Sequence, residues 1–342
     1  MNPETSWKAL VAAVGGSIDG DAVQHFGAPG DELAAARDGA AVVPLTQLGV
    51  LRVAGPDARA FLQSQLTSDL EQVSPTAAQL SGYCTPKGRL LATFLLVLHG
   101  DGYRLVLPRS VAVPLETRLR KYVLRSKVSI AADDIPLLGV CGPSAHAALS
   151  QVFPSPPRLP LEAAQHREAS VALLPGDCFL LLIDPPRAGD LWARLSRLAR
   201  PAGEAAWNWR QIRAGVANVL PATQEAFLPQ MLGMDTYGAV SLQKGCYPGQ
   251  EIVARTHYLG NLKRHLTRAF ARSATRAGDS LLCSGDEPAG TVAIAAPSPD
   301  GGWEMLAVVR SEALADDNLH LADGTPVQLA PTLPPEGAGG HR

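Results

Sequence analysis

The residues best suited to chemistry lie together in one short segment, residues 244–251, which reads KGCYPGQE. The thiolate is the reactive form of cysteine, and a nearby cation lowers the pKa of a thiol. Lys244 lies two positions before Cys246, and Arg255 follows downstream. The segment therefore predicts an activated cysteine that acts as a nucleophile or as a metal ligand.

Two glycines bound this cysteine, and polar residues follow it. Gly245 and Gly249 permit positive φ or the close approach of a ligand or another backbone, and Gln250 and Glu251 supply hydrogen-bonding groups. A structural turn around a buried cysteine would explain a lone KGC tripeptide. A purely structural turn needs few polar or basic residues, however, so their density here favours a functional site.

The remaining cysteines narrow the chemistry. They are scattered and form no CxxC pair: Cys84, Cys141, Cys178 and Cys283. A zinc ribbon, a self-contained four-cysteine cluster and a disulfide framework are all disfavoured by this spacing. His257 could pair with Cys246 as in Cys/His nucleophiles, although an exposed loop histidine explains it as well.

Other candidates each have a structural alternative. Residues 67–69, including Asp69, could hydrogen-bond a heterocycle or simply end a helix. Trp209 could stack on a flat aromatic ligand or lie in the core. The basic residues between 118 and 127 could contact RNA or an acidic partner, or form a solvated face, since no aromatic residues interleave them.

Composition limits the class of protein. The chain has 342 residues, 46% hydrophobic and 18% charged, with a formal net charge of −2. This length allows two or three domains, and the charge argues against a surface built for nucleic acid or anionic membrane. No signal peptide or membrane-spanning segment is indicated, which together with the cysteines predicts a cytoplasmic protein.

The elements that must position these residues follow two similar patterns. Strands at 51–53, 80–84, 90–98, 103–107 and 123–130, with helices at 57–66 and 110–122, predict a ferredoxin-like unit. Strands at 137–141, 169–174 and 179–183, with helices at 143–151, 190–199 and 207–215, repeat part of that order. Short strands from 262 to 329, separated by Gly, Asp and Pro, predict a small antiparallel barrel.

These patterns predict an α+β fold with two ferredoxin-like subdomains and a C-terminal antiparallel β-barrel. The expected parts are an N-terminal extension (1–36), a first unit (37–135), a second unit carrying the cysteine segment (136–260), the barrel (261–330) and a disordered tail (331–342).

Three segments resemble one known family. They are KGCYPGQEIVART at 244–256, GPDARAFLQSQLTSD at 55–69 and PKGRLLATF at 86–94. They are similar to the YgfZ family of folate-binding proteins, relatives of the glycine-cleavage aminomethyltransferase. The resemblance implies an aminomethyltransferase-like cloverleaf around a central folate site, and a role in assembling or repairing iron–sulfur clusters in enzymes such as radical tRNA-modifying enzymes.

The resemblance also implies site residues and partners. Cys246 and Lys244 would be catalytic, and Cys246 would contact a transient iron–sulfur cluster shared with a carrier or client protein. Tetrahydrofolate is the implied cofactor, with direct nucleic-acid binding not expected and a monomer expected. The residues expected around the folate are Asp69, Trp209, Gly245, Tyr247, Gly249, Gln250, Glu251 and Arg255.

A folate-dependent one-carbon transferase is the alternative within the same resemblance. The transferase relatives carry an aspartate where Cys246 stands and a folate-contacting glutamate where Arg213 stands. These departures favour an accessory factor over an aminomethyltransferase, with altered folate contacts.

Overall fold

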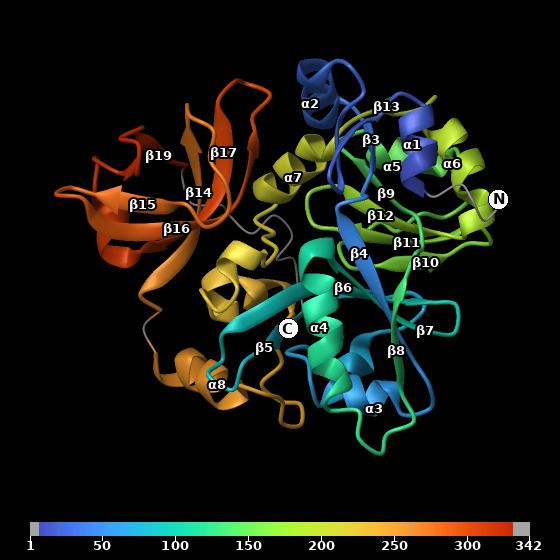
Figure 1. The fold of residues 1–342 in the computed structure, drawn as a ribbon, viewed down its shortest axis with the longest axis horizontal. Coiled ribbons are helices and arrows are strands. Elements are labelled where there is room, and N and C mark those ends of the chain that lie inside the picture. The colour runs from blue at the N-terminus through green and yellow to red at the C-terminus, as the bar shows by residue number, and fades with distance from the viewer. Residues whose placement is uncertain (1–6, 261, 331–342) are drawn as a thin grey trace.

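A computed structural model describes residues 7–260 and 262–330. Three sheet-based parts surround a central region of short helices, as Figure 1 shows. The expected α+β architecture with a C-terminal barrel is confirmed. The disordered tail expected at 331–342 lies outside the described residues.

The first sheet contains five strands in the order β5-β6-β7-β4-β8. Helices α3 and α4 pack on one face of it, joined by residues such as Phe61, Phe94 and Leu119. This is the expected ferredoxin-like order with one added strand. Its elements are β4 (Leu48–Ala54), α3 (Ala58–Gln63), η1 (Leu70–Gln72), β5 (Gln79–Cys84), β6 (Leu90–His99), β7 (Gly102–Pro108), α4 (Arg109–Arg120) and β8 (Ser129–Asp133).

The last strand of this unit differs from the prediction. Residues 123–130 were expected to be a strand, but turns occupy 121–126 and β8 begins only at Ser129. Leu124, with φ of 43°, is 87% exposed. A left-handed residue cannot continue a strand, so the apolar pattern here marks an exposed turn instead.

The second sheet has the order β10-β11-β12-β9-β3-β13. Strand β3 pairs antiparallel with β9, in the place that the fourth strand of a ferredoxin-like unit would occupy, and β13 pairs parallel with β3. The elements are β3 (Ala41–Pro44), β9 (Leu137–Cys141), α5 (Ala145–Ser150), β10 (Ala163–Gln165), β11 (Ala169–Leu174), β12 (Cys178–Ile183), η2 (Pro185–Arg187), α6 (Ala188–Leu195), β13 (Arg200–Pro201) and α7 (Glu204–Arg213).

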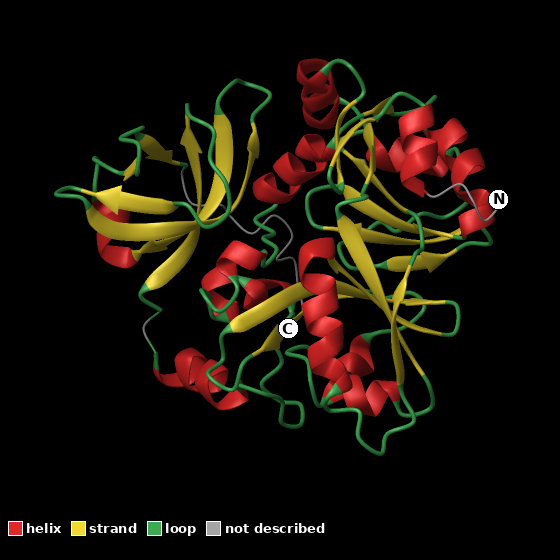
Figure 2. Cartoon of the chain, in the orientation of Figure 1, coloured by secondary structure: helices red, strands yellow, loops and turns green. Residues whose placement is uncertain are grey.

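The N-terminal region belongs to this second part and is more than an extension with one short helix. It folds into α1 (Trp7–Ala13), β1 (Ser17–Asp19), β2 (Ala22–His25) and α2 (Pro29–Asp38), with Val11 and Val23 fully buried. Helices α1, α5 and α6 cover the outer face of the sheet (Figure 2). The predicted boundary at residue 37 would have placed β3 in the first unit. The structure instead places β3 in the second sheet.

The C-terminal part is a nearly closed sheet in the order β18-β15-β16-β17-β14-β19. Its elements are β14 (Arg264–Ala271), β15 (Ser280–Cys283), β16 (Glu287–Pro297), β17 (Trp303–Arg310), η6 (Ser311–Ala315), β18 (His320–Leu321) and β19 (Val327–Leu329). A shared core joins all three parts, including Val97 of β6, Leu180 of β12, Trp207 of α7 and Leu306 of β17.

The centre of the molecule is filled by short helical turns between α7 and α8. They are η3 (Pro221–Thr223), η4 (Pro229–Leu232) and η5 (Met234–Tyr237), and helix α8 (Gln250–Leu259) follows them. Helix α8 was not predicted, and it places His257 on a helix rather than on a loop.

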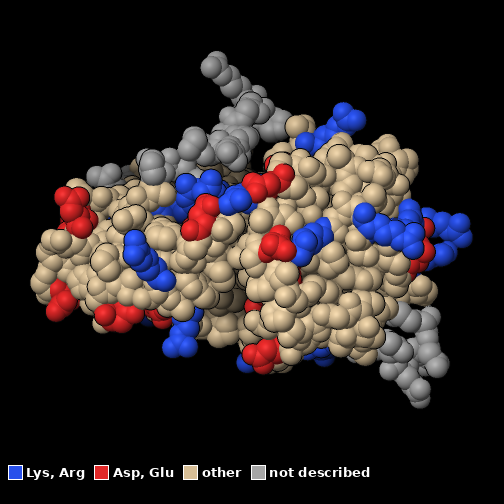
Figure 3. All heavy atoms as spheres, turned by 90° about the horizontal axis from the view of Figure 1, so that it is seen from above, with Lys and Arg blue, Asp and Glu red and all other residues tan. Residues whose placement is uncertain are grey.

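The distribution of charged side chains on the surface is consistent with the small net charge of −2. Figure 3 shows acidic and basic side chains scattered together over one face. Among the described helices, none has the length and apolar character needed to cross a membrane.

Candidate functional site

The segment 244–251 forms a bent loop that leads directly into α8. Gly249 is the residue before the helix and has φ of 83°, a conformation that strongly favours glycine. The Gln250 amide donates to the Tyr247 carbonyl at 3.1 Å, and the Val253 amide donates to the Gly249 carbonyl at 3.2 Å. These bonds close the turn and start the helix.

This loop is docked on the tip of the β5–β6 hairpin. A Cβ on Gly249 would lie 2.4 Å from the Thr85 carbonyl oxygen and 2.7 Å from Gly88 Cα. The tip itself is held by the Gly88 amide, which donates to the Thr85 carbonyl at 2.9 Å, and by Arg89, whose Nη1 donates to the Ala226 carbonyl at 2.8 Å. Two segments that resemble the YgfZ family, far apart in sequence, therefore meet through backbone contact.

Lys244 anchors the same loop to the end of α3. Its Nζ donates to the carbonyl oxygens of Leu66 at 2.8 Å and Ser68 at 2.7 Å. Burial lowers the pKa of Lys244 to about 8, and the nearby charge of Asp69 opposes that shift. The lysine is thus a partly buried anchor whose ammonium group is directed at backbone carbonyls.

The side chains around Cys246 divide into buried and exposed groups. Tyr247 is buried, and burial raises its pKa; among the described residues its hydroxyl has no hydrogen-bond partner. Cys246 is the one exposed cysteine of the five, and its exposed neighbours in this region include Gln243, Gly245, Glu251 and Arg255. Gln250 turns inward, with Nε2 3.5 Å from the Lys244 carbonyl oxygen. The loop therefore presents the Cys246 thiol to solvent on a fixed backbone.

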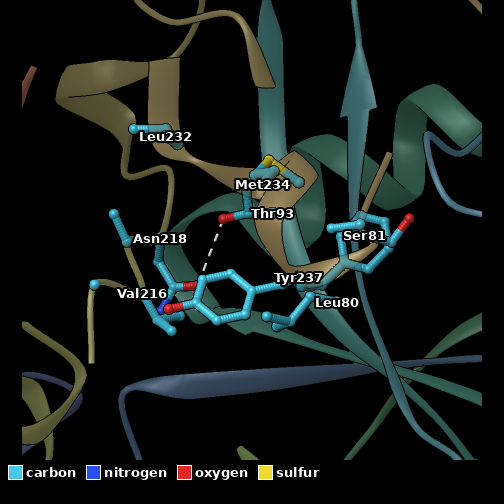
Figure 4. Close-up of a pocket in the computed structure, with 12 residues that line it drawn as sticks. Leu80, Ser81, Thr93, Val216, Asn218, Leu232, Met234 and Tyr237 are labelled. Atoms are coloured by element: carbon cyan, nitrogen blue, oxygen red, sulfur yellow. Dashed lines mark hydrogen bonds between the residues drawn. The ribbon is translucent and has the colours of Figure 1, made fainter. Parts of the chain in front are cut away.

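A narrow cavity lies at the meeting point of the first sheet, the segment after α7 and the central turns (Figure 4). The cavity volume is about 30 Å³, so its side chains nearly fill it. The lining is mostly apolar, with a few polar side chains. The residues are Leu80, Ser81, Thr93, Phe94, Gly215, Val216, Ala217, Asn218, Leu232, Met234, Tyr237 and Ala239.

The polar groups of the cavity have defined orientations. Thr93 Oγ1 donates to Asn218 Oδ1 at 3.4 Å and accepts from the Val219 amide at 2.9 Å. With Oδ1 of Asn218 accepting from Thr93, its Nδ2 is the group that would donate to a ligand. Tyr237 is fixed by its hydroxyl, which donates to the Ala214 carbonyl at 2.5 Å.

The cavity and the cysteine loop share supporting residues. Ser68, whose carbonyl accepts from Lys244, donates through Oγ to Ser81 Oγ in the cavity wall at 2.7 Å. Thr67 Oγ1 donates to the carbonyl of Ala239, another lining residue, at 2.7 Å. The three-residue segment 67–69 therefore joins the two features. Its Asp69 caps η1 by accepting from the Glu71 amide at 3.2 Å, and it also accepts from Gln63 Nε2 at 2.8 Å.

Several candidate residues lie elsewhere. Trp209 is buried and donates through Nε1 to Glu304 Oε1 of the barrel at 2.8 Å, so it joins α7 to β17 and does not line the cavity. Arg213 also faces Glu304, at 3.6 Å. His257 lies in the last turn of α8, about 10 Å along the helix from Gln250, and among the printed interactions of the described residues it stacks edge-on with Tyr258 rather than contacting Cys246.

Metal ligands do not gather around the thiol. Within residues 7–260 and 262–330, no group of three or more His, Cys, Asp or Glu side chains could hold a metal ion. Any cluster contact through Cys246 would need ligands from another molecule.

Sequence reasoning missed Asn218, Thr93 and Tyr237 as lining residues. Asn218 is a single polar residue within the apolar run 216–220, which is a weak signal that something polar faces it. Thr93 lies in the middle of the apolar β6 pattern and gave no signal of its own. Only the folded chain brings these residues together.

Comparison with known proteins agrees with this arrangement. A family model described as the GCVT N-terminal domain matches residues 19–175. A glycine cleavage system aminomethyltransferase T from Bartonella henselae aligns with a TM-score of 0.80, covering 95% of each chain at 17% identity. The chain therefore has the aminomethyltransferase T fold.

Sequence relatives define the family more narrowly. The chain is 37% identical over 294 residues to the tRNA-modifying protein YgfZ of Edwardsiella ictaluri, covering 83% of this chain and 88% of the relative. It is 32% identical over 306 residues to the protein of that name from Shigella boydii serotype 4, covering 86% and 93%. The chain belongs to the YgfZ family.

Proposed function

We propose that this protein binds tetrahydrofolate in the central cavity and uses Cys246 to assist iron–sulfur cluster assembly or repair in client enzymes, such as radical tRNA-modifying enzymes. The observation that carries the proposal is the shared segment 67–69, which supports both the cavity wall and the lysine that anchors the Cys246 loop. Names of the relatives, which describe tRNA modification, support the choice of clients.

The chemical character of the cavity lining suits the head group of a folate, but the cavity in this structure is too small to hold it. A pterin needs an apolar slot with a few polar groups at its edge, which is the usual composition of a small-molecule site. Asn218 and Thr93 supply those polar groups. Because the cavity volume is only about 30 Å³, a bicyclic ring would enter only after flexible side chains such as Met234 and Leu232 rotate.

Each residue of the site has a distinct part in the proposal. Asn218 would orient the bound ring through its amide group, and Lys244 would hold the cysteine loop in place. Tetrahydrofolate, when bound, would supply a reduced pterin that can carry one-carbon units or electrons. Cys246 would offer a single thiolate, and since iron–sulfur clusters commonly use four protein ligands, the client or carrier would supply the others.

A complementation experiment tests the role of Cys246. A strain lacking its family member would receive wild type, Cys246→Ser, Cys246→Ala, or Gln243→Ala as a neighbouring exposed control. We expect wild type and Gln243→Ala to restore radical tRNA-modifying activity and both Cys246 variants to fail. Full rescue by either Cys246 variant would show that the function does not require the Cys246 thiol.

The one-carbon transferase alternative has its own test. Purified protein would be incubated with tetrahydrofolate and amine donors, and methylenetetrahydrofolate would be measured. We expect no turnover, because Arg213, in the position of the transferase glutamate, faces Glu304 of the barrel. Turnover that depends on the protein would favour the transferase.

A further inference from the structure

Two of the buried cysteines lie directly opposite each other in the second sheet. Cys141 ends β9 and Cys178 begins β12, and the register of this antiparallel pair aligns them. Both are fully buried and face the core shared by the three parts. Neither belongs to the cavity or to the Cys246 loop, so the proposed function does not use them.

The hydrogen-bond pattern determines how close the two residues are. The Gly142 amide donates to the Asp177 carbonyl at 3.2 Å, so the pair next to the cysteines is a hydrogen-bonded pair. Paired residues alternate between hydrogen-bonded and non-hydrogen-bonded positions, so the cysteines occupy a non-hydrogen-bonded one. Cα atoms there are about 4.5 Å apart, within the roughly 4.4–6.8 Å range that disulfides span.

The surroundings make one of the two sulfurs the better nucleophile. Burial raises the pKa of Cys178, but the neighbouring Cys141 thiol and the Arg210 guanidinium favour its thiolate and lower that pKa overall. In the structure the Cys178 thiol donates to the Gly176 carbonyl at 3.5 Å. The pKa of Cys141 is raised by the neighbouring Cys178 side chain and by burial. Arg210 is held in place by its Nε and Nη2, which both donate to the Gly176 carbonyl, at 3.1 and 2.5 Å.

We propose that Cys141 and Cys178 form a redox site at which hydrogen peroxide produces a cross-strand disulfide. The Cys178 sulfur attacks one peroxide oxygen, the O–O bond breaks, and the leaving hydroxide takes a proton to become water. Cys141 then attacks the resulting sulfenic acid, the S–S bond forms, and the S–O bond breaks with release of a second water. Two thiols and one peroxide thus give one disulfide and two waters.

The route to the buried sulfurs is the turn that precedes Cys178. Gly176 and Asp177 both have positive φ, at 80° and 53°, and the Asp177 side chain is exposed. A tight turn at the edge of two strands opens more readily than the strands themselves. Oxidation therefore requires local opening, and we expect it to be slower than oxidation of the exposed Cys246 thiol.

The test uses the full chain with Cys246→Ser, which prevents disulfides between molecules. Protein is treated with hydrogen peroxide, denatured in N-ethylmaleimide and digested with trypsin. Cleavage after lysine and arginine places Cys141 in peptide 128–158 and Cys178 in peptide 168–187. We expect these two peptides joined, with a mass two hydrogens below their sum, and separated again by dithiothreitol.

Two other buried cysteines serve as internal controls. Cys84 lies opposite Leu90 and Cys283 opposite Glu287, so neither has a sulfur across from it, and both should stay fully alkylated. A Cys141→Ala variant should leave Cys178 oxidised but unbridged. The proposal is overturned if, at a peroxide dose that consumes Cys246 in wild type, Cys141 and Cys178 are alkylated as completely as Cys84 and Cys283, or if either pairs elsewhere.

Discussion

Gly249→Ala tests how the cysteine loop is held. In the structure this glycine has φ of 83° and touches the hairpin tip through backbone atoms, so an added methyl group has no flexible neighbour to displace. The loop would have to lift from Thr85 and Gly88, and the first turn of α8 would change with it. The hairpin and the Cys246 loop would no longer dock as they do.

The expected cost combines two effects. A left-handed conformation costs a non-glycine residue about 1–2 kcal/mol. Contacts of 2.4 Å and 2.7 Å to backbone atoms require a shift of the kind that overpacking causes, which costs about 1–3 kcal/mol. The free energy of unfolding should therefore fall by about 2–5 kcal/mol, unless α8 detaches as a unit and limits the loss.

Gly245→Ala is the matched control, because Gly245 lies on the same loop, four positions before Gly249. An added Cβ at Gly245 meets nothing within 4 Å, so its stability should stay within about 0.5 kcal/mol of wild type. Urea unfolding followed by tryptophan fluorescence and circular dichroism measures both variants. Equal stabilities for Gly249→Ala and Gly245→Ala would refute the docking described for this loop.

Three further predictions follow from buried groups. Because burial lowers the pKa of Lys244 to about 8, the unfolded chain binds more protons than the folded chain between that value and 10.5. The free energy of unfolding of wild type, measured relative to Lys244→Met, should thus rise with pH across this window; a flat difference would contradict the burial of the ammonium group. Alkylation of the native protein should modify Cys246 rapidly and the four buried cysteines only after denaturation, and a second fast thiol would contradict the burial pattern. Trp209→Phe should lower the free energy of unfolding by about 1–3 kcal/mol, because it removes a hydrogen bond from the buried Glu304 carboxylate; a loss below about 0.5 kcal/mol would show that this contact contributes little.

Local patterns in the sequence predicted much of the fold. Strand β9 was predicted at its observed ends, and α4 within two residues, because an apolar strand or a helical stripe is visible within one segment. The place of β3 in the second sheet could not be predicted, since it depends on pairing with a strand almost 100 residues away. Helix α8 was missed because its polar residues show no clear apolar face, and its start depends on the docking of Gly249.

The site divides in the same way. The sequence indicated Cys246 and Lys244 because glycines, cations and a thiol occur together in one loop. It did not show that Lys244 binds the carbonyl oxygens of the α3 end, or that Asn218 faces Thr93 in a cavity, since these contacts join segments 125 or more residues apart. Trp209 was predicted to stack on a pterin, but its indole nitrogen donates to Glu304 of the barrel, a contact that the sequence could not show.

The most direct test of the proposed function is an anaerobic calorimetric titration with tetrahydrofolate. Wild type would be compared with Asn218→Leu and with Asn208→Leu, a half-buried asparagine of α7 that does not line the cavity. Loss of one hydrogen bond of about 1.4 kcal/mol weakens binding about tenfold. We predict that Kd rises about tenfold or more for Asn218→Leu and stays unchanged for Asn208→Leu. Absence of binding by wild type, or equal affinity for wild type and Asn218→Leu, would contradict the assignment of this cavity to folate.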